Sequence, residues 1–167
     1  MNEHWFNFFV VILTQLVIFL IHARAEGRLR EAPRILMLGV TIGIPFGFLF
    51  DLIVGKTIGF FSYSLGFASL FLIVNGALSY GFMQANVLLM DKRGLIHFYV
   101  WSVIVGALYE LVNLRFPVWH WEFASSTVAI PFVIISGYFG LALLMALVWH
   151  LLGHRFSFIT AFLPKHD

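Results

Sequence analysis

Long apolar stretches alternate with short polar connectors from one end of the chain to the other. A helix that crosses a lipid bilayer needs roughly 20 mainly apolar residues, and five stretches come close to that length. The pattern therefore predicts about five transmembrane helices, over residues 5–21, 35–54, 67–90, 95–112 and 127–152. The predicted fold class is an all-α, polytopic membrane helix bundle.

We expect a single transmembrane domain over residues 1–167. The first span and its basic connector occupy 1–34, two hairpins of similar length follow at 35–94 and 95–152, and a short tail occupies 153–167. The first apolar run lacks a basic leader and a small-residue cleavage site, so we expect it to be retained as a span.

Composition supports lipid as the solvent of this chain. Hydrophobic residues make up 61% and charged residues 11%, and the mean hydropathy is +0.95. Soluble domains have about a quarter of their residues charged, and a globule this small cannot hide so many apolar side chains from water. The chain has no cysteine, which excludes disulfides and thiol chemistry. The net charge of +2 arises from short basic patches beside the spans, so we expect no nucleic-acid partner.

Basic residues are divided unevenly between the connectors. If connector 22–34 is cytoplasmic, that side holds eight of the ten lysines and arginines, and the other side holds Lys56 and Arg115. The eight are Arg24, Arg28, Arg30, Arg34, Lys92, Arg93, Arg155 and Lys165. Because cytoplasmic connectors carry an excess of basic residues, we expect the N-terminus outside and the C-terminus in the cytoplasm. Small size and the lack of a targeting peptide favour a bacterial inner membrane.

Pairs of small residues four positions apart recur in the last four predicted helices. They are Gly43/Gly47, Ala77/Gly81, Ser102/Gly106 and Ser136/Gly140. Such pairs let helix backbones approach closely inside a membrane, so we interpret them as packing positions. Pro45 lies between Gly43 and Gly47 and predicts a kink in that helix.

Two segments resemble each other at an offset of about sixty residues, one starting at Phe50 and the other at Tyr109. The corresponding pairs are Asp51 and Glu110, Lys56 and Arg115 and, after one inserted residue, Phe61 and Trp121, Tyr63 and Phe123, and Gly76 and Gly137. Both units run in the same direction, so hairpins 35–94 and 95–152 are predicted to be parallel repeats related by an axis along the membrane normal. Chance similarity between two apolar hairpins is the alternative.

The repeat places Asp51 and Glu110 at the outer ends of the second and fourth predicted helices. An ionisable residue within a span is a candidate functional group, and a buried carboxyl group can hold a proton and deliver it. The two acids are therefore the candidate catalytic residues. The alternative is that both lie at the headgroup level, in contact with water or in surface salt bridges with Lys56 and Arg115.

Aromatic and amide side chains near the acids are the candidate substrate-binding residues. They are Phe61, Tyr63, Asn75, Trp119, Trp121 and Phe123. Aromatic faces attract cations, so such a pocket suits a reaction that passes through positive charge. A belt of aromatic rings at the membrane interface explains the tryptophans equally well. Asn75, Ser79 and Asn86 share one face of the third predicted helix, where hydrogen bonds between helices are the ordinary explanation.

Histidines do not form a recognisable metal motif in this sequence. We interpret His97 and His150, near the cytoplasmic ends of their spans, as structural. Glu110, His120 and Glu122 lack the spacing of a zinc site. We therefore expect no metal and no cofactor.

With these residues the chain resembles the lycopene cyclase-domain type of small membrane protein, which serves carotenoid biosynthesis. In that family an acid ends one helix, a G-x-W-x-Y loop follows, and a glycine-containing helix returns. Asp51, Gly59, Phe61 and Tyr63 fit this pattern, with phenylalanine in place of tryptophan, and Glu110, Trp121 and Phe123 fit it more loosely. The resemblance covers residues 48–145.

One departure limits what the resemblance implies. The family carries two adjacent glutamates after a proline in the returning helix, and these acids are thought to drive cyclisation. The corresponding tripeptides here are Asn75-Gly76-Ala77 and Ser136-Gly137-Tyr138, without an acid. The resemblance therefore implies a shared architecture more directly than a shared reaction.

Three functions are compatible with the sequence. The first is a non-catalytic membrane component that binds lipid or isoprenoid, or that joins a homo-oligomer or a partner membrane protein. The second is a cofactor-independent isoprenoid or carotenoid cyclase or isomerase, in which Asp51 or Glu110 protonates an alkene. The third is a small transporter, for which five spans are few and a dimer is expected.

Overall fold

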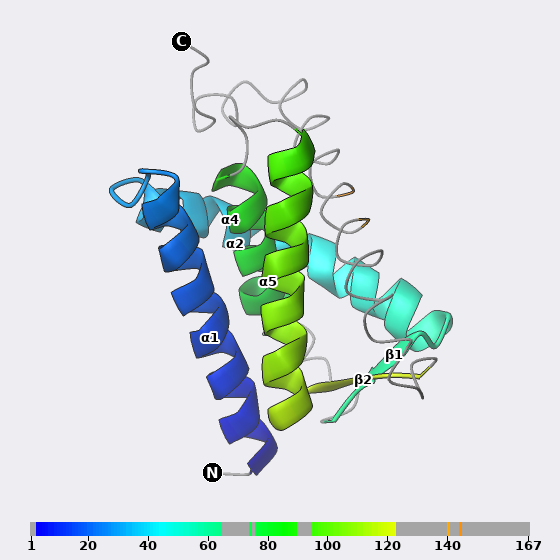
Figure 1. Ribbon diagram of the computed structural model, residues 1–167. Helices are drawn as coiled ribbons and strands as arrows, with labels where there is room; N and C mark the ends of the chain where they lie inside the picture. The colour runs from blue at the N-terminus through cyan, green and yellow to red at the C-terminus, as the bar shows by residue number, and fades with distance from the viewer. Residues whose placement is uncertain are drawn as a thin grey trace.

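The computed structural model describes residues 3–64, 74, 76–89, 95–122, 140 and 144. The prediction of a mostly helical chain is confirmed, with one short strand pair added to it (Figure 1). In chain order the elements are α1 (Glu3–Ala25), α2 (Ala32–Phe50), the π-helix η1 (Asp51–Thr57), β1 (Phe61–Tyr63), the π-helix η2 (Gly76–Tyr80), α4 (Gly81–Leu89), α5 (Leu95–Arg115) and β2 (Trp119–Trp121). The fifth predicted span, 127–152, lies outside the described residues apart from 140 and 144.

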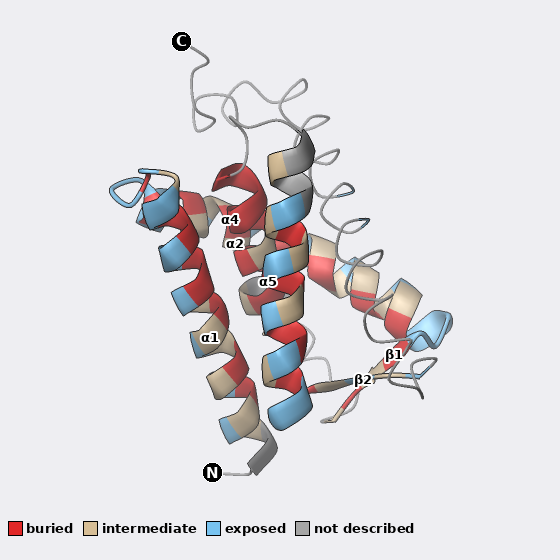
Figure 2. Cartoon of the chain, viewed as in Figure 1, coloured by how far each residue is buried: buried red, intermediate tan, exposed pale blue. Residues whose placement is uncertain are grey.

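Two helical segments in the described part of the chain are long and apolar enough to cross a membrane. They are Trp5–Ala25, with a mean hydropathy of 2.2, and Ala32–Thr57, with a mean hydropathy of 2.0. Within the 18-residue apolar window of each segment, only 39% and 22% of the residues are buried inside the protein. Figure 2 shows exposed positions along the length of α1 and α5, and many of the exposed residues are large and apolar.

Helix α2 continues through Pro45 to Phe50, where its hydrogen-bond pattern widens into η1. A π-helical turn carries one more residue between bonded groups than an α-helical turn, and such turns are frequent at functional sites. Asp51 is the first residue of η1 and is fully buried. The second predicted span thus changes its helical geometry at the candidate acid.

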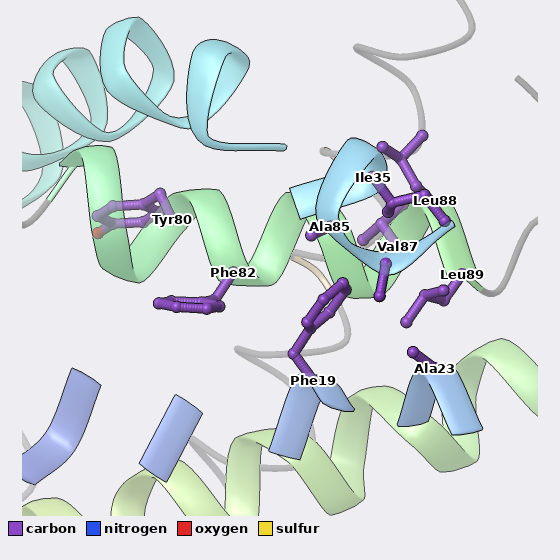
Figure 3. Packing of buried hydrophobic residues seen from close by; sticks show 10 residues of the cluster. Phe19, Ala23, Ile35, Tyr80, Phe82, Ala85, Val87, Leu88 and Leu89 are labelled. Carbon is purple, nitrogen blue, oxygen red and sulfur yellow. The ribbon is translucent and has the colours of Figure 1, made fainter. Parts of the chain in front are cut away.

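Glycines determine how closely α2 packs on η2 and α4. A Cβ added to Gly39 would lie 2.6 Å from the Gly81 carbonyl oxygen, and one added to Gly43 would overlap the Gly81 backbone. Around this contact a hydrophobic cluster joins α1, α2, η2 and α4 (Figure 3). Its members include Phe19, Ala23, Ile35, Tyr80, Phe82, Ala85 and Leu89. The small residues Gly43 and Gly81, expected to be packing positions, lie at this interface.

The segments that follow η1 and α5 pair as strands β1 and β2, which run antiparallel (Figure 1). Phe61 is opposite Trp121, Ser62 opposite His120, and Tyr63 opposite Trp119. Alternate residues of a strand point to opposite faces, so the aromatic-polar-aromatic pattern of both segments places four rings on one face. Phe61 and Tyr63 are buried on that face, whereas His120 is exposed.

The strand pair closes one end of the helical layer. Phe61, Tyr63 and Val118 form a second hydrophobic cluster with Phe8 and Val11 from the first half of α1. The turn after α1 and the start of α5 lie at the opposite end in Figure 1. The acids and the aromatic strands are therefore separated from the Arg-rich connector by the length of the helices.

Candidate functional site

Asp51 accepts two hydrogen bonds in the protein interior. The hydroxyl groups of Tyr63 and Tyr80 both donate to its Oδ1, at 2.9 Å and 2.8 Å. The Asp51 side chain is 0% exposed. Three separate elements, η1, β1 and η2, therefore converge on one carboxyl oxygen.

Glu110 has a matching arrangement on α5. The indole Nε1 atoms of Trp119 and Trp121 both donate to its Oε1, at 3.2 Å and 3.0 Å. Glu110 is 3% exposed. Each of the two acids thus accepts two hydrogen bonds from aromatic side chains on a single oxygen.

The strand pair joins the two acids into one network. Tyr63, which donates to Asp51, is the register partner of Trp119, which donates to Glu110. Antiparallel register partners lie about 4.5–5.5 Å apart at Cα. Both carboxyl groups therefore accept hydrogen bonds from side chains that lie opposite each other on the strand pair β1–β2.

Aromatic rings pack around this network. The Phe61 ring is buried and makes edge-to-face contacts with Tyr63 and Trp121, with centroids 5.5 Å and 5.6 Å apart. It also stacks on Phe50, which in turn lies 5.5 Å from the Tyr80 ring. Aromatic pairs at these separations are attractive beyond their burial. The rings that neighbour the Asp51 donors therefore form one continuous packed layer.

Asn113 holds β2 in place, a role that the sequence analysis did not identify. Its Oδ1 accepts from the backbone N–H groups of Val118 and Trp119, at 2.8 Å and 3.1 Å, and its Nδ2 donates 2.8 Å to the Trp119 carbonyl. It lies three residues after Glu110, on the same face of α5. The signal available in the sequence is an asparagine four residues before Pro117.

Tyr80 is the second missed residue. The sequence pattern places Asn75, Ser79 and Asn86 on one face of the third predicted helix and gives no link between Tyr80 and Asp51. The two residues are 29 positions apart, so no helical or strand period relates them. Only the packing of η2 against the end of α2 brings them together.

The structure places four of the six predicted substrate-binding residues around the acids. Tyr63, Trp119 and Trp121 donate hydrogen bonds to them, and Phe61 packs among these rings. Asn75 and Phe123 lie outside the residues whose side chains the structure describes.

The interior position of the acids differs from the water-exposed alternative considered from the sequence. Lys56 and Arg115 are exposed, whereas Asp51 and Glu110 are buried. His120 and Glu122 also lie on the exposed side of the ribbon, where Ser64 and Ser62 are their hydrogen-bond partners. They are thus turned away from Glu110, and these three residues do not form a joint ligand set.

The arrangement suits a carboxyl group in either protonation state. A tyrosine O–H and an indole N–H are neutral donors, so they can bond a carboxylate oxygen or the carbonyl oxygen of a carboxylic acid. In the second case the proton is on the other oxygen of the same group. Buried carboxyl groups of this kind, beside aromatic faces that attract positive charge, can exchange protons with an apolar molecule.

The chain matches no protein-family model, no curated protein and no solved structure.

Proposed function

We propose that this chain is a small integral membrane protein of the lycopene cyclase-like architecture, which binds an isoprenoid or another apolar lipid at the aromatic layer beneath the strand pair. The observation that carries the proposal is the joined network of Asp51 and Glu110, each bonded by aromatic donors within packed rings. An apolar chain is the ligand that suits a site lined by aromatic rings.

Exposed apolar surface supports the membrane part of the proposal. The core helix of a soluble protein is mostly buried, but Trp5–Ala25 and Ala32–Thr57 are buried over less than half of their apolar windows. Met37, Leu13 and Ile21 are more than half exposed. Lipid is the solvent that stabilises such faces. The proposal includes five spans in a bacterial inner membrane, with the N-terminus outside.

The pairing of the two strands supports duplicated hairpins as part of the same proposal. Phe61 and Trp121, which correspond in the proposed repeat, are register partners, although the strand donors to the acids, Tyr63 and Trp121, are not corresponding positions. In both cases an acid near the end of a helix is bonded by the following strand. Antiparallel pairing of β1 with β2 is also the geometry expected when a two-fold axis along the membrane normal relates two hairpins.

Ligand binding can be tested with a polyene isoprenoid added to the full chain in lipid nanodiscs. Energy transfer from Trp119 and Trp121 to the polyene should quench tryptophan fluorescence with a saturable dependence on concentration. Phe61→Leu should weaken binding about tenfold, because it replaces the ring at the centre of the layer. Phe60→Leu, next to it and half exposed, is the matched control. Equal affinities for the two variants, or linear quenching, would contradict the proposal.

A catalytic role is the second candidate, and the two neutral donors on a single carboxyl oxygen favour it. Asp51 or Glu110 would transfer a proton to an alkene carbon, forming a C–H bond and leaving a carbocation beside the rings. A second double bond of the substrate would then attack the cation, closing a ring and leaving the positive charge on another carbon; in an isomerisation no ring would form. In both paths the carboxylate would finally remove a proton from a carbon next to the cation, which forms a new double bond, restores the acid and leaves the redox state unchanged.

Solvent deuterium distinguishes catalysis from binding alone. Incubation of a linear polyene with the protein in D2O should give a cyclised or isomerised product that carries deuterium. The Asp51→Asn, Glu110→Gln double variant should still bind the polyene and form no such product. Product formation by that double variant would eliminate the proton-transfer mechanism while leaving the binding proposal intact.

A further inference from the structure

A second cluster of ionisable side chains lies at the other end of the helices. It consists of His22 near the end of α1, Glu26 one residue beyond α1, and His97 near the start of α5. One potential ligand atom from each residue lies within 4.8 Å of the others. His97 and Glu110 are thirteen residues apart on α5, so the cluster is about 20 Å from the acids along the helix.

The three side chains already face a common point. His22 and Glu26 are four residues apart on the same helical face, and the His22 Nε2 lies 3.8 Å from the Glu26 Oε1. The His97 Nε2 reaches the same oxygen at 2.8 Å. Glu26 is almost fully buried, although it follows the last residue of α1. Both imidazole rings therefore direct Nε2 toward one carboxylate.

Hydrogen bonding determines which nitrogen of His22 carries the proton. The Asn86 Nδ2 donates 2.8 Å to the Phe82 carbonyl, so its Oδ1 is the atom that faces His22. That oxygen can only accept, and the His22 Nδ1, 2.8 Å away, must therefore donate. In a neutral ring the Nε2 then carries the lone pair. It is fully buried and has no hydrogen-bond partner among the described residues.

Aromatic stacking fixes the orientation of the His22 ring. Trp101 lies parallel to it, with ring centroids 4.2 Å apart and planes 21° apart. Trp101 also makes an edge contact with His97, one turn earlier on α5. A ligating histidine characteristically donates its second N–H to an oxygen and is held by neighbouring groups. His22 has both features.

We propose that His22, Glu26 and His97 bind a divalent transition-metal ion of the zinc class. Two imidazoles and one carboxylate form a known ligand set for zinc that leaves a fourth position open for water or another ligand. A tetrahedral ion with bonds of about 2.0–2.1 Å holds its ligand atoms roughly 3.4 Å apart. The two histidine-to-Glu26 separations, 2.8 Å and 3.8 Å, lie on either side of that value, and the two histidine nitrogens lie within 4.8 Å of each other, so side-chain movements of about an ångström are needed to complete the site.

The site would link three helices at one end of the protein. His22 and Glu26 come from the end of α1, His97 from α5, and Asn86 supports His22 from α4. Metal binding to a preformed folded site stabilises the folded state. This inference involves a different end of the molecule and different residues from the proposed lipid site, so the two can fail separately.

Cobalt provides a direct test on the full chain in detergent. After treatment with a chelator, Co2+ should bind with a stoichiometry of one and produce the visible absorption of a four-coordinate ion. Zn2+ should remove that absorption. Metal should also raise the melting temperature of the wild-type protein. Absence of the four-coordinate spectrum at saturating Co2+ would overturn the proposal.

Substitutions test the assignment of the ligands. His97→Asn and Glu26→Gln should each weaken Co2+ binding at least tenfold, since each removes a ligand, and both should abolish the metal-dependent rise in melting temperature. His97 is 27% exposed at its side chain, so its replacement is compatible with folding, which the metal-free melting curve checks. His120→Asn, an exposed histidine at the opposite end, should bind as the wild type does. Wild-type affinity in the His97 variant, or loss of binding in the His120 variant, would refute the site.

Discussion

Asp51 and Glu110 each accept hydrogen bonds from two aromatic side chains on one carboxyl oxygen. A buried polar atom that loses its partner costs free energy, because water cannot replace the bond. The donors therefore hold the acids in place, and the acids hold the donors. This mutual dependence makes the side chains of this network the most sensitive positions at the strand end of the protein.

Replacement of Glu110 by glutamine should destabilise the protein. The amide keeps an acceptor oxygen but introduces an NH2 group among the Trp119 and Trp121 donors, and we expect a loss of about 1–3 kcal/mol in the free energy of unfolding. Denaturation by SDS in mixed micelles measures this value. Glu122→Gln, an exposed residue bonded to Ser62, should change it by less than about 0.5 kcal/mol. Equal losses in the Glu110 and Glu122 variants would show that the burial of Glu110 does not cause the destabilisation.

The two tyrosine donors to Asp51 should act cooperatively. Tyr63→Phe and Tyr80→Phe each remove one hydroxyl group, and each should lower the free energy of unfolding by about 1 kcal/mol. The double variant leaves the buried Asp51 oxygen without both tyrosine donors, so its loss should exceed the sum of the single losses by about 0.5 kcal/mol or more. Strict additivity in the same SDS titration would contradict a shared acceptor.

Close backbone approach organises the helices around α2. Gly39 and Gly43 face Gly81 so closely that no side chain fits between the two backbones. Association inside a membrane depends on such packing, because lipid is as apolar as the side chains. The same contact brings Tyr80 to Asp51 at the junction of α2 and η1.

Gly43→Ala should therefore damage both packing and the acid network. The added methyl group overlaps the Gly81 backbone, and we expect a loss of about 1–3 kcal/mol or more. Ile44→Ala, on the exposed side of the same helix, is the control and should change stability little in detergent. Thermal unfolding of the two variants under identical conditions measures the difference. A stable Gly43→Ala variant would mean that α2 and η2 do not pack as closely as described.

The strand pair predicts a specific cross-link. Ser62 and His120 are register partners on the outer face of the ribbon, and the chain contains no cysteine of its own. A Ser62→Cys, His120→Cys double variant should form an intramolecular disulfide on mild oxidation, visible as faster migration on a non-reducing gel. The single variants can form only intermolecular dimers. A double variant that yields dimers alone would exclude the observed register.

In the part of the chain that the structure describes, large apolar side chains are exposed along the helices, and the two clusters of ionisable side chains lie at opposite ends. One end carries the acids and the strand pair. The other carries the Arg-rich connector and the cluster of His22, Glu26 and His97. This division is expected when the middle of a protein is surrounded by hydrocarbon and its ends meet water.

Single cysteines can test the proposed orientation, because the natural chain has none. Arg30 and Lys56 are both exposed and flank the Ala32–Thr57 segment. In intact bacteria, a membrane-impermeant maleimide should label Lys56→Cys. It should label Arg30→Cys only after the cells are opened, since basic connectors stay in the cytoplasm. The reverse pattern would show that the topology is opposite to the one proposed. Labelling of both cysteines from outside would exclude a membrane span between them.

The sequence by itself determined the helical class, two apolar segments long enough to cross a membrane and the aromatic-polar-aromatic motifs. These features depend on local periodicity and composition, which a linear reading detects. It also singled out Asp51 and Glu110, because a charge is conspicuous within an apolar stretch. It did not identify the strand pair, since segments of three residues carry little local signal and these two are joined only across about sixty positions.

Tertiary structure decided which groups meet. Tyr80 reaches Asp51, Asn86 sets the proton position of His22, and His97 approaches Glu26 across 71 residues. From the sequence His97 is interpreted as a structural residue, because a histidine within a span more often has a backbone or hydroxyl partner than a metal ligand role. Contacts of this kind depend on how closely the helices pack and on the angle at which each side chain leaves its helix. Neither quantity can be read from the residue order of a single helix. Both clusters of side chains could therefore be identified only in the folded structure.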